Sequence, residues 1–384
     1  MRMPSALTAT CLSLALLAAP ARAADNAVPA KGDVEALIDQ AQTWLLSKQL
    51  PTGAFAADQF GLGITALATD AIAAQPKGVT DEHVAKALAL LKSNQQADGG
   101  IYTKEQGLGN YCTAITLMAL ASAGKLDEEK DLVKKAQAYL FKGQVTEGKN
   151  AGGMGYDPTD GPGHEDMPNT IMAIQGLKAS GVPATDAHLQ AAIKFLEHCQ
   201  NLSSVNPAPW VDNDAGRGSA VYTPNESQAN GSFEEPANKT DPVKKLTGTG
   251  SMTYSLLSSY IALDLKKDDP RVAAALDWCK RNYRFDANPG MTTGHEHEGL
   301  LYYYVFLAKT MKTLGIKELE LPDGKKVDWR ADLFAAIKAM GKDVPVGDKK
   351  GTMFMNDAKR WGETFPHLAT AYVIKALKDI DASL

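Results

Sequence analysis

Acidic and histidine side chains gather at three places in the sequence, each close before an apolar run. These places are 164–166 (His-Glu-Asp), 295–298 (His-Glu-His-Glu) and 361–367, which holds Trp361 and His367. A histidine can act as a base near neutral pH, and a neighbouring carboxylate can orient it or serve as the general acid. The candidate catalytic residues are therefore His164, Glu165, Asp166 and Glu298.

The same histidines suit a divalent metal such as zinc, for which imidazole is a common ligand. His295 and His297 lie on one turn of the chain and, with His367, make a three-ligand set. Cys112 is a further candidate, as a ligand or as a nucleophile beside His164, but its almost uncharged surroundings favour packing in the core. In the alternative, the carboxylates cap helix N-termini and the histidines bond to them at a solvated rim. That alternative is favoured for each residue alone, and a functional role is favoured for the group.

Aromatic and amide side chains near the same places are candidates for holding a ligand. Aromatic rings that line a cavity bind apolar or sugar molecules by stacking. Successive positions of a helix point in different directions, so at most one or two of the three tyrosines at 302–304 can face a cavity. The candidate ligand-binding residues are Asn110, Asn169, Tyr254, Tyr302, Tyr303 and Trp361.

An internal repeat must position these residues. Six segments carry an apolar stripe with spacing i, i+3, i+7 and Ala at its centre, which is typical of a helix exposed on one side; they begin at Ile38, Val84, Val133, Leu189, Val272 and Leu333. In the first four, a glutamine follows the Ala by eight positions, and a Gly-rich stretch then ends the helix; these glutamines are Gln49, Gln95, Gln144 and Gln200. Each stripe is followed by a segment that is apolar on nearly every side and must be buried on every side.

Six amphipathic helices that alternate with six buried ones predict an all-α fold. The simplest packing is an (α/α)6 toroid of six helical hairpins, with the buried helices as an inner barrel and the striped helices as an outer ring. An open solenoid would have polar faces on its end pairs, and the first and last pairs here are as apolar as the others. In a closed ring, the N-termini of the inner helices meet at one end of a central cavity, together with four of the seven histidines. The fourth pair carries a long insertion, about 201–250, which we expect to form a lid.

The N-terminal residues predict export. Arg2, an apolar run over 6–19 and the sequence Ala-Arg-Ala at 21–23 indicate a secretory signal, 1–23, that is cleaved near Ala23. The remaining 24–384 form a single toroid domain, secreted or periplasmic, and no later segment is expected to span a membrane. A net charge of −5 argues against a nucleic-acid partner. Three cysteines remain after cleavage: Cys112, Cys199 and Cys279. They allow at most one disulfide, and Cys199 with Cys279 is one possible pair.

The second and third pairs resemble a known repeat. The run 94–102 (Asn-Gln-Gln-Ala-Asp-Gly-Gly-Ile-Tyr), followed by the segment 111–120, is similar to the prenyltransferase and squalene oxidase repeat of terpenoid cyclases and protein prenyltransferase β subunits. This resemblance implies a terpenoid cyclase-like α/α toroid. The Asp-x-Asp-Asp motif that protonates substrate in squalene-type cyclases is absent, and Asn110 stands where the β subunits carry the Asp of Asp-x-Cys. The resemblance therefore implies neither a squalene cyclase nor a protein prenyltransferase.

Three functions follow as hypotheses. The first is an exported toroid that binds an isoprenoid-like or other apolar ligand in its central cavity, with its turnover left open. The second is a carbohydrate-active hydrolase or lyase, which requires two carboxylates, such as Asp166 and Glu298, to face one another across the mouth beside aromatic rings. The third is a non-catalytic interaction scaffold that makes its contacts through the insertion.

Overall fold

The computed structural model describes residues 26–56, 60–73, 81–105, 107–157, 164–211, 215–229 and 245–384. The predicted signal at 1–23 and part of the insertion, 230–244, lie outside the described residues. Within the described ranges the chain forms twelve α-helices, one short 3-10 helix and two antiparallel hairpins of short strands. None of these helices is long and apolar enough to cross a membrane.

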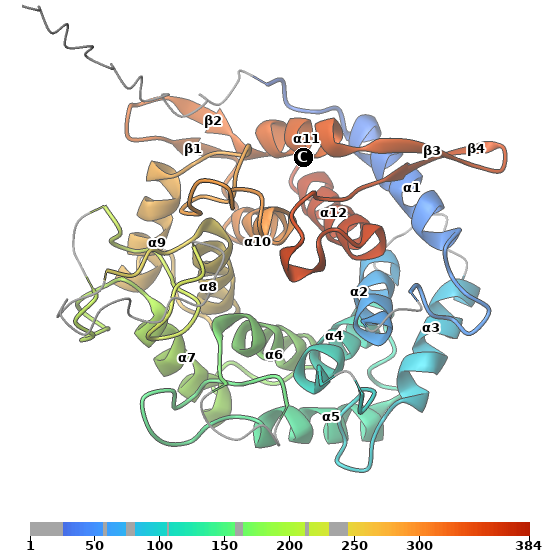
Figure 1. Ribbon diagram of the computed structural model, residues 1–384, viewed down its shortest axis with the longest axis horizontal. Helices are drawn as coiled ribbons and strands as arrows, with labels where there is room; N and C mark the ends of the chain where they lie inside the picture. Colours follow the sequence, from blue (N-terminus) through green and yellow to red (C-terminus); the bar gives the residue numbers. More distant parts are fainter. Residues whose placement is uncertain are drawn as a thin grey trace, which may run out of the picture.

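The inner barrel is made by the segments that are apolar on nearly every side, as the sequence predicts. Each inner helix contacts the next, and the last contacts the first, so that the ring closes (Figure 1). Most residues of these helices are buried, because one side packs on the outer ring and another on the neighbouring inner helices. The inner helices are α2 (Gly61–Ala73), α4 (Gly109–Ser122), α6 (Met167–Ala179), α8 (Gly250–Ala262), α10 (Leu300–Thr313) and α12 (Pro366–Asp381).

The outer ring is made by the striped segments. The outer helices turn their apolar stripes inward, and the central Ala of the stripe is fully buried in the first five, as at Ala41, Ala87 and Ala136. In the sixth, the central Ala336 is only partly buried. The outer helices are α1 (Lys31–Leu46), α3 (Asp81–Ser93), α5 (Lys130–Lys142), α7 (Ala187–Cys199), α9 (Pro270–Arg281) and α11 (Trp329–Met340). The closed all-α toroid predicted from the sequence is thereby confirmed.

Two strand hairpins flank α11 and were not expected from the helical repeat. The first pairs β1 (Glu318–Glu320) with β2 (Lys326–Asp328), and the second pairs β3 (Lys342–Val346) with β4 (Lys349–Met353). Strand β4 packs on α1, where Gly351 lies so close to Trp44 that a methyl group there would be 3.1 Å from the Trp44 Cβ. The second hairpin thus joins the last outer helix to the first and seals the outer ring.

The repeated glutamines hold consecutive outer helices together. Gln144 Nε2 donates to the carbonyl of Gly152 at 2.9 Å and to the carbonyl of His188, in the first turn of the next outer helix, at 2.8 Å. The glutamines of the other three pairs make the same two kinds of bond; they are Gln49, Gln95 and Gln200. Each glutamine therefore links the Gly-rich bend after its own helix to the first turn of the next outer helix through two backbone carbonyls.

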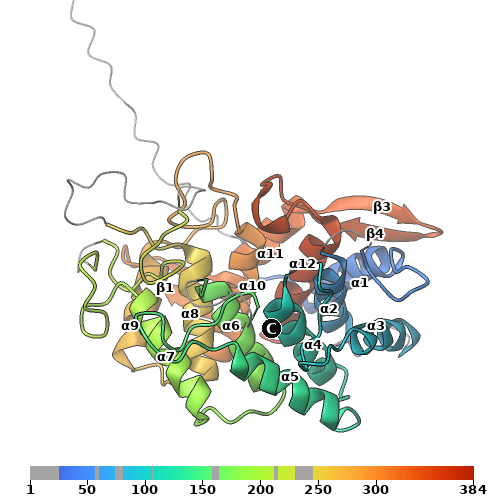
Figure 2. The ribbon, with the colours of Figure 1, turned by 60° about the horizontal axis from the view of Figure 1, so that its bottom comes forward.

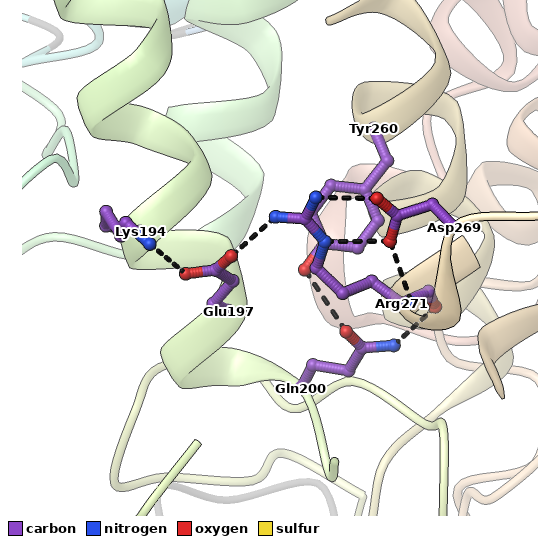
Figure 3. A network of polar contacts seen from close by, with 6 residues as sticks. All are labelled: Lys194, Glu197, Gln200, Tyr260, Asp269 and Arg271. Carbon is purple, nitrogen blue, oxygen red and sulfur yellow. Dashed lines mark hydrogen bonds and ion pairs between the residues drawn. The ribbon is translucent and has the colours of Figure 1, made fainter. Parts of the chain in front are cut away.

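At the fourth pair this junction carries an ionic network, shown in Figure 3. The Arg271 guanidinium donates to Glu197 of α7 at 2.6 Å and to Asp269 at 2.7 Å. Tyr260 of α8 donates to Gln200 Oε1 at 3.2 Å, so that α7, α8 and α9 meet here. The hydrogen bond from Arg271 holds the pKa of Asp269 below its usual value. The network fixes the outer ring on both sides of the long insertion.

Candidate functional site

The loops that precede α8, α10 and α12 rise from the same face of the ring (Figure 2). We call the space enclosed by the six inner helices the lumen, and the end at their N-termini the mouth. Asp166 is the N-cap of α6 at this mouth, and its Oδ1 accepts from the Asn169 backbone N at 2.7 Å. The Asn169 side-chain amide lies 3.0 and 3.1 Å from the two Asp166 oxygens. Asn110, at the start of α4, donates to the Asn169 carbonyl at 2.8 Å, which ties the two helix N-termini together.

The insertion supplies a further contact to Asp166. The Tyr222 hydroxyl donates to Asp166 Oδ2 at 2.7 Å and lies 3.3 Å from the hydroxyl of Tyr156. Burial raises the pKa of Asp166 to about 6, although the hydrogen bonds from Asn169 and Tyr222 act in the opposite direction. The described part of the predicted lid therefore docks into the mouth and meets a carboxyl group that titrates close to neutral pH.

Tyr111 and Tyr302 come from inner helices on opposite sides of the ring, and both lie near enough to Asp166 to feel its charge. Burial raises the pKa of Tyr111 of α4 well above its usual value, and the charge of Asp166 and the proximity of Tyr302 add to this shift. Burial likewise raises the pKa of Tyr302 of α10, with contributions from Tyr372 and Asp166. Tyr111, Tyr302 and Tyr372 are only half-buried, although their helices are enclosed by the outer ring. Side chains of this kind line an internal space, so the mouth of the lumen has an aromatic wall.

Two of the predicted ligand-binding tyrosines lie elsewhere. Tyr254 and Tyr303 are fully buried, with ring centroids 5.5 Å apart, and Tyr303 donates to the carbonyl of Arg284 at 2.8 Å. Both side chains therefore fill the core between the inner and outer rings, because one step along a helix from Tyr302 turns Tyr303 away from the lumen. The structure brings Asn110, Asn169 and Tyr302 to the mouth and leaves Tyr254 and Tyr303 in the core.

Trp361 lies at the rim of the mouth, on the 3-10 helix Arg360–Gly362, and is 39% exposed. Its backbone φ is 60°, a left-handed conformation that is rare for a side chain of this size. The ring packs over Gly299, the N-cap of α10, and beneath the Arg360 guanidinium at 4.7 Å. With Tyr222 and Met252, Trp361 lines a small cavity under the insertion.

Of the predicted catalytic residues at 164–166, only Asp166 joins this network. His164 is exposed, and Glu165 is buried and accepts from Asn150 at 2.8 Å. The fourth, Glu298, binds His295 at 2.9 Å and lies 3.7 Å from the Arg360 guanidinium. Asp166 and Glu298 thus bind different partners, and neither carboxylate accepts from a group that the other also binds.

The predicted metal ligands are also dispersed. His297 binds Asp357 at 3.0 Å, whereas His367 packs its ring 5.4 Å from that of Trp44. Cys112 is buried where α4 meets α2, and burial raises the pKa of its thiol to about 12. Within the described ranges, no three His, Cys, Asp or Glu side chains lie together in a way that could hold a metal ion. All three cysteines of 24–384 are buried free thiols, so Cys199 and Cys279 form no disulfide.

A second buried carboxylate, Glu363, belongs to the acidic and histidine group at 361–367 but is not among the catalytic candidates chosen from the sequence. It accepts from the backbone N–H of Tyr302 at 2.9 Å and of Leu301 at 3.3 Å, and so caps α10 from the loop before α12. Asn356 donates to the same carboxylate at 2.6 Å. Burial raises the pKa of Glu363 to about 7. The only sequence signal is its place before the last apolar segment, which it shares with Trp361 and His367.

Glu363 makes a testable contribution to the pH dependence of stability. Its pKa is about 7 in the folded chain against an ordinary 4.5, so the folded state binds this proton more tightly and stability rises as the pH falls through that window. Between about pH 7.5 and about pH 5.5, the free energy of unfolding of the wild type should rise by about 2 kcal/mol relative to Glu363→Gln. Urea unfolding of both proteins at each pH measures this difference. If the free energy of unfolding changes with pH equally in both proteins, the prediction is contradicted.

Solved structures with this architecture include a terpene cyclase. The type II terpene cyclase MstE from Scytonema, in its apo form, superposes with a TM-score of 0.57 at 14% identity, over 93% of this chain and 100% of that one. A variant of MstE in complex with its substrate, geranylgeranyl dihydroxybenzoate, gives a TM-score of 0.54 at 15% identity, over 92% and 99% of the chains. A protein from Actinoplanes gives 0.50 at 15% identity, over 91% and 99%. No protein-family model and no curated protein matches the sequence.

Proposed function

Because the chain has a terpenoid cyclase-like fold, we propose that it binds an isoprenoid-like ligand in its lumen and that Asp166 acts on this ligand as a general acid. The observation that carries the proposal is a buried carboxyl with a pKa of about 6 that faces an aromatic wall. The MstE variant described above holds a prenylated substrate, which supports an isoprenoid as the ligand class.

The arrangement suits proton transfer to a carbon–carbon double bond. The proton of the Asp166 carboxyl adds to one carbon of the double bond, whose electron pair forms the new C–H bond and leaves a cation at the other carbon. The Asn169 N–H and the Tyr222 hydroxyl are placed to stabilise the carboxylate that remains. The faces of Tyr111 and Tyr302 attract the cation. Loss of a proton from the adjacent carbon, to the Asp166 carboxylate or to water, then forms a new double bond and neutralises the cation.

Binding is tested first, without any assumption about turnover. Native mass spectrometry of protein from its own source should reveal a co-purified lipid-like molecule, and prenyl compounds of graded length should raise the melting temperature of the purified protein. A clean mass without ligand, together with an unchanged melting temperature for the whole series, would overturn the proposal.

Tyr222→Phe tests whether the insertion tunes the acid. The hydrogen bond from Tyr222 favours the ionised carboxylate, so its loss should raise the pKa of Asp166. The pH above which product formation declines should move upward by about one unit. Tyr304→Phe is the matched control, because it removes a buried hydroxyl that bonds to the carbonyl of Phe285, away from Asp166. Equal profiles for the two variants would show that Tyr222 does not set the pKa.

We also propose that residues 1–23 direct export and are removed near Ala23. The basis is the sequence pattern alone: an early arginine, an apolar run and a small-residue cleavage site. N-terminal sequencing of protein recovered from separate cell fractions tests the proposal. An exported chain should begin close to Ala24, whereas an intact N-terminus in the cytosolic fraction alone would contradict it.

A further inference from the structure

At the opposite end of the lumen, polar side chains from all six inner helices converge at the helix C-termini. We call this group the lysine floor. Lys309 of α10 donates to Gln175 Oε1 of α6, so this contact joins two inner helices that are not neighbours in the ring, since α8 stands between them. The other members are Asp70 of α2, Ser122 of α4, Ser258 of α8, and Lys375 and Lys378 of α12.

The lysine floor carries more positive than negative charge. Lys375 donates to Asp70, and Ser122 donates to the same carboxylate at 2.6 Å. Burial alone would raise the pKa of Asp70, yet the charge and hydrogen bond of Lys375 hold it below its usual value, so the carboxylate is ionised. Beside the floor, Lys312 and Asp379 form an ion pair at 2.6 Å, so their two charges cancel. Among the described residues, the floor therefore has one negative group, the Asp70 carboxylate, and three positive groups, the ammonium groups of Lys309, Lys375 and Lys378.

The donors of the lysine floor also outnumber its acceptors. An ammonium group has three N–H donors. Within the described part of the chain, Lys309 is bonded to Gln175, Lys375 to Asp70, and Lys378 to the Ala71 carbonyl. Burial lowers the pKa of Lys309 to about 8 and of Lys378 to about 7, which is the cost of holding these charges in the interior without enough negative partners. An anion placed among the three lysines would supply both the charge and the acceptors.

We propose that the lysine floor binds the anionic end, a carboxylate or a phosphate, of the molecule that occupies the lumen. This inference rests on the proposed function and adds a substrate class: an amphiphile whose apolar body lies along the aromatic wall and whose charged end lies at the C-termini of the inner helices. Asp166 and Gln175 are nine residues apart along α6, so the acid and the floor are separated by about 14 Å along the lumen. The reacting double bond should therefore lie far from the charged end, near the opposite end of the molecule.

The test compares probes that differ only in their charged end: a prenyl phosphate, the matching prenyl carboxylate and the uncharged prenyl alcohol. In the wild type, isothermal titration should show at least about tenfold tighter binding of one or both anions than of the alcohol. Lys309→Met should abolish this difference, and Lys312→Met, at the same end but paired with Asp379 outside the floor, should retain it. The preferred anion decides between phosphate and carboxylate.

Each outcome bears on one of the two proposals. Equal binding of all three probes by the wild type would overturn the lysine floor as an anion site and leave the proposed function standing. If no prenyl probe binds, the proposed function fails, but titration with inorganic phosphate still tests the lysine floor. If phosphate stabilises the wild type and not Lys309→Met, the result supports an anion site. If phosphate does not stabilise the wild type, the anion site is overturned.

A measurement on the wild type alone protects the test against misfolding of a variant. The charge of a carboxylate probe is constant between about pH 6 and about pH 9, whereas Lys309 and Lys378 lose protons over this range. The other charged groups that face them are Asp70, whose pKa is held below its usual value, Lys375 and the Lys312–Asp379 pair. Affinity for the prenyl carboxylate should therefore fall about tenfold or more across this range, while affinity for the alcohol stays level. If the affinities for the carboxylate and for the alcohol change with pH in the same way, the proposal is overturned.

Discussion

Asp166→Asn should lower the rate of product formation by about a thousandfold, with ligand affinity changed by only a few-fold. The amide keeps the size of the carboxyl group and can still accept from the Asn169 N–H, but it has no acidic proton to give. Single-turnover measurements with a bound prenyl substrate separate the chemical step from binding. The effect should appear in the rate of that step and not in the dissociation constant.

The matched control for this substitution is Glu165→Gln. Glu165 is adjacent in sequence and also buried, but its carboxylate faces Asn150. The control should retain the wild-type rate to within a few-fold. If both variants lose activity equally, the loss reflects disturbance of the loop, and Asp166 is not the acid.

The pH dependence of the reaction has a defined sign. An acid must be protonated to act, and the pKa of Asp166 is about 6. The rate should therefore be highest below that pH and fall about tenfold for each further pH unit above it. A rate that rises through the same range would assign Asp166 the role of a base.

Gly152→Ala should destabilise the fold by about 3 kcal/mol or more. Gly152 has φ of 89°, and a methyl group there would lie 2.0 Å from the carbonyl oxygen of Ala191 in the next outer helix. Only glycine permits both the left-handed conformation and the close approach that lets Gln144 bond to both segments. Urea unfolding followed by circular dichroism measures the loss as a lower midpoint.

Gly148→Ala separates the two causes of this loss. Gly148 lies in the same loop with φ of 80°, but nothing lies within 4 Å of the added methyl group. Its substitution should therefore show the conformational cost alone, about 1 kcal/mol. Equal destabilisation by the two substitutions would mean that the contact with α7 adds nothing to stability.

The ring could be predicted from the sequence because its two kinds of helix differ in composition over whole segments. The stripe around Ala136 and the uncharged run that starts near Cys112 each extend over several turns, so single residues do not decide the outcome. The glutamines that mark the repeat in the sequence each donate hydrogen bonds to two backbone carbonyls in the structure. The two hairpins beside α11 are too short for a pattern, since β1 and β2 have three residues each.

The site was harder to predict because it depends on rotation about a helix and on contacts from distant loops. Tyr302 and Tyr303 are adjacent in sequence, yet one faces the lumen and the other faces Arg284. Tyr222 lies in an insertion without periodicity, and nothing in its surroundings links it to Asp166. The histidines do lie on loops near the mouth, but the rim is wide enough for His295 and His297 to bind separate carboxylates.

The closure of the ring by α12 has a consequence for how the protein comes to be folded. The last helix fills the place between α10 and α2, so segments from the two ends of the chain must meet before the barrel exists. Contacts of such long sequence separation form late and slowly. Until α12 is in place, α2 and α10 each keep uncovered the flank that α12 covers in the folded ring. An intermediate in which α12 has not yet docked therefore exposes apolar surface and is prone to aggregate.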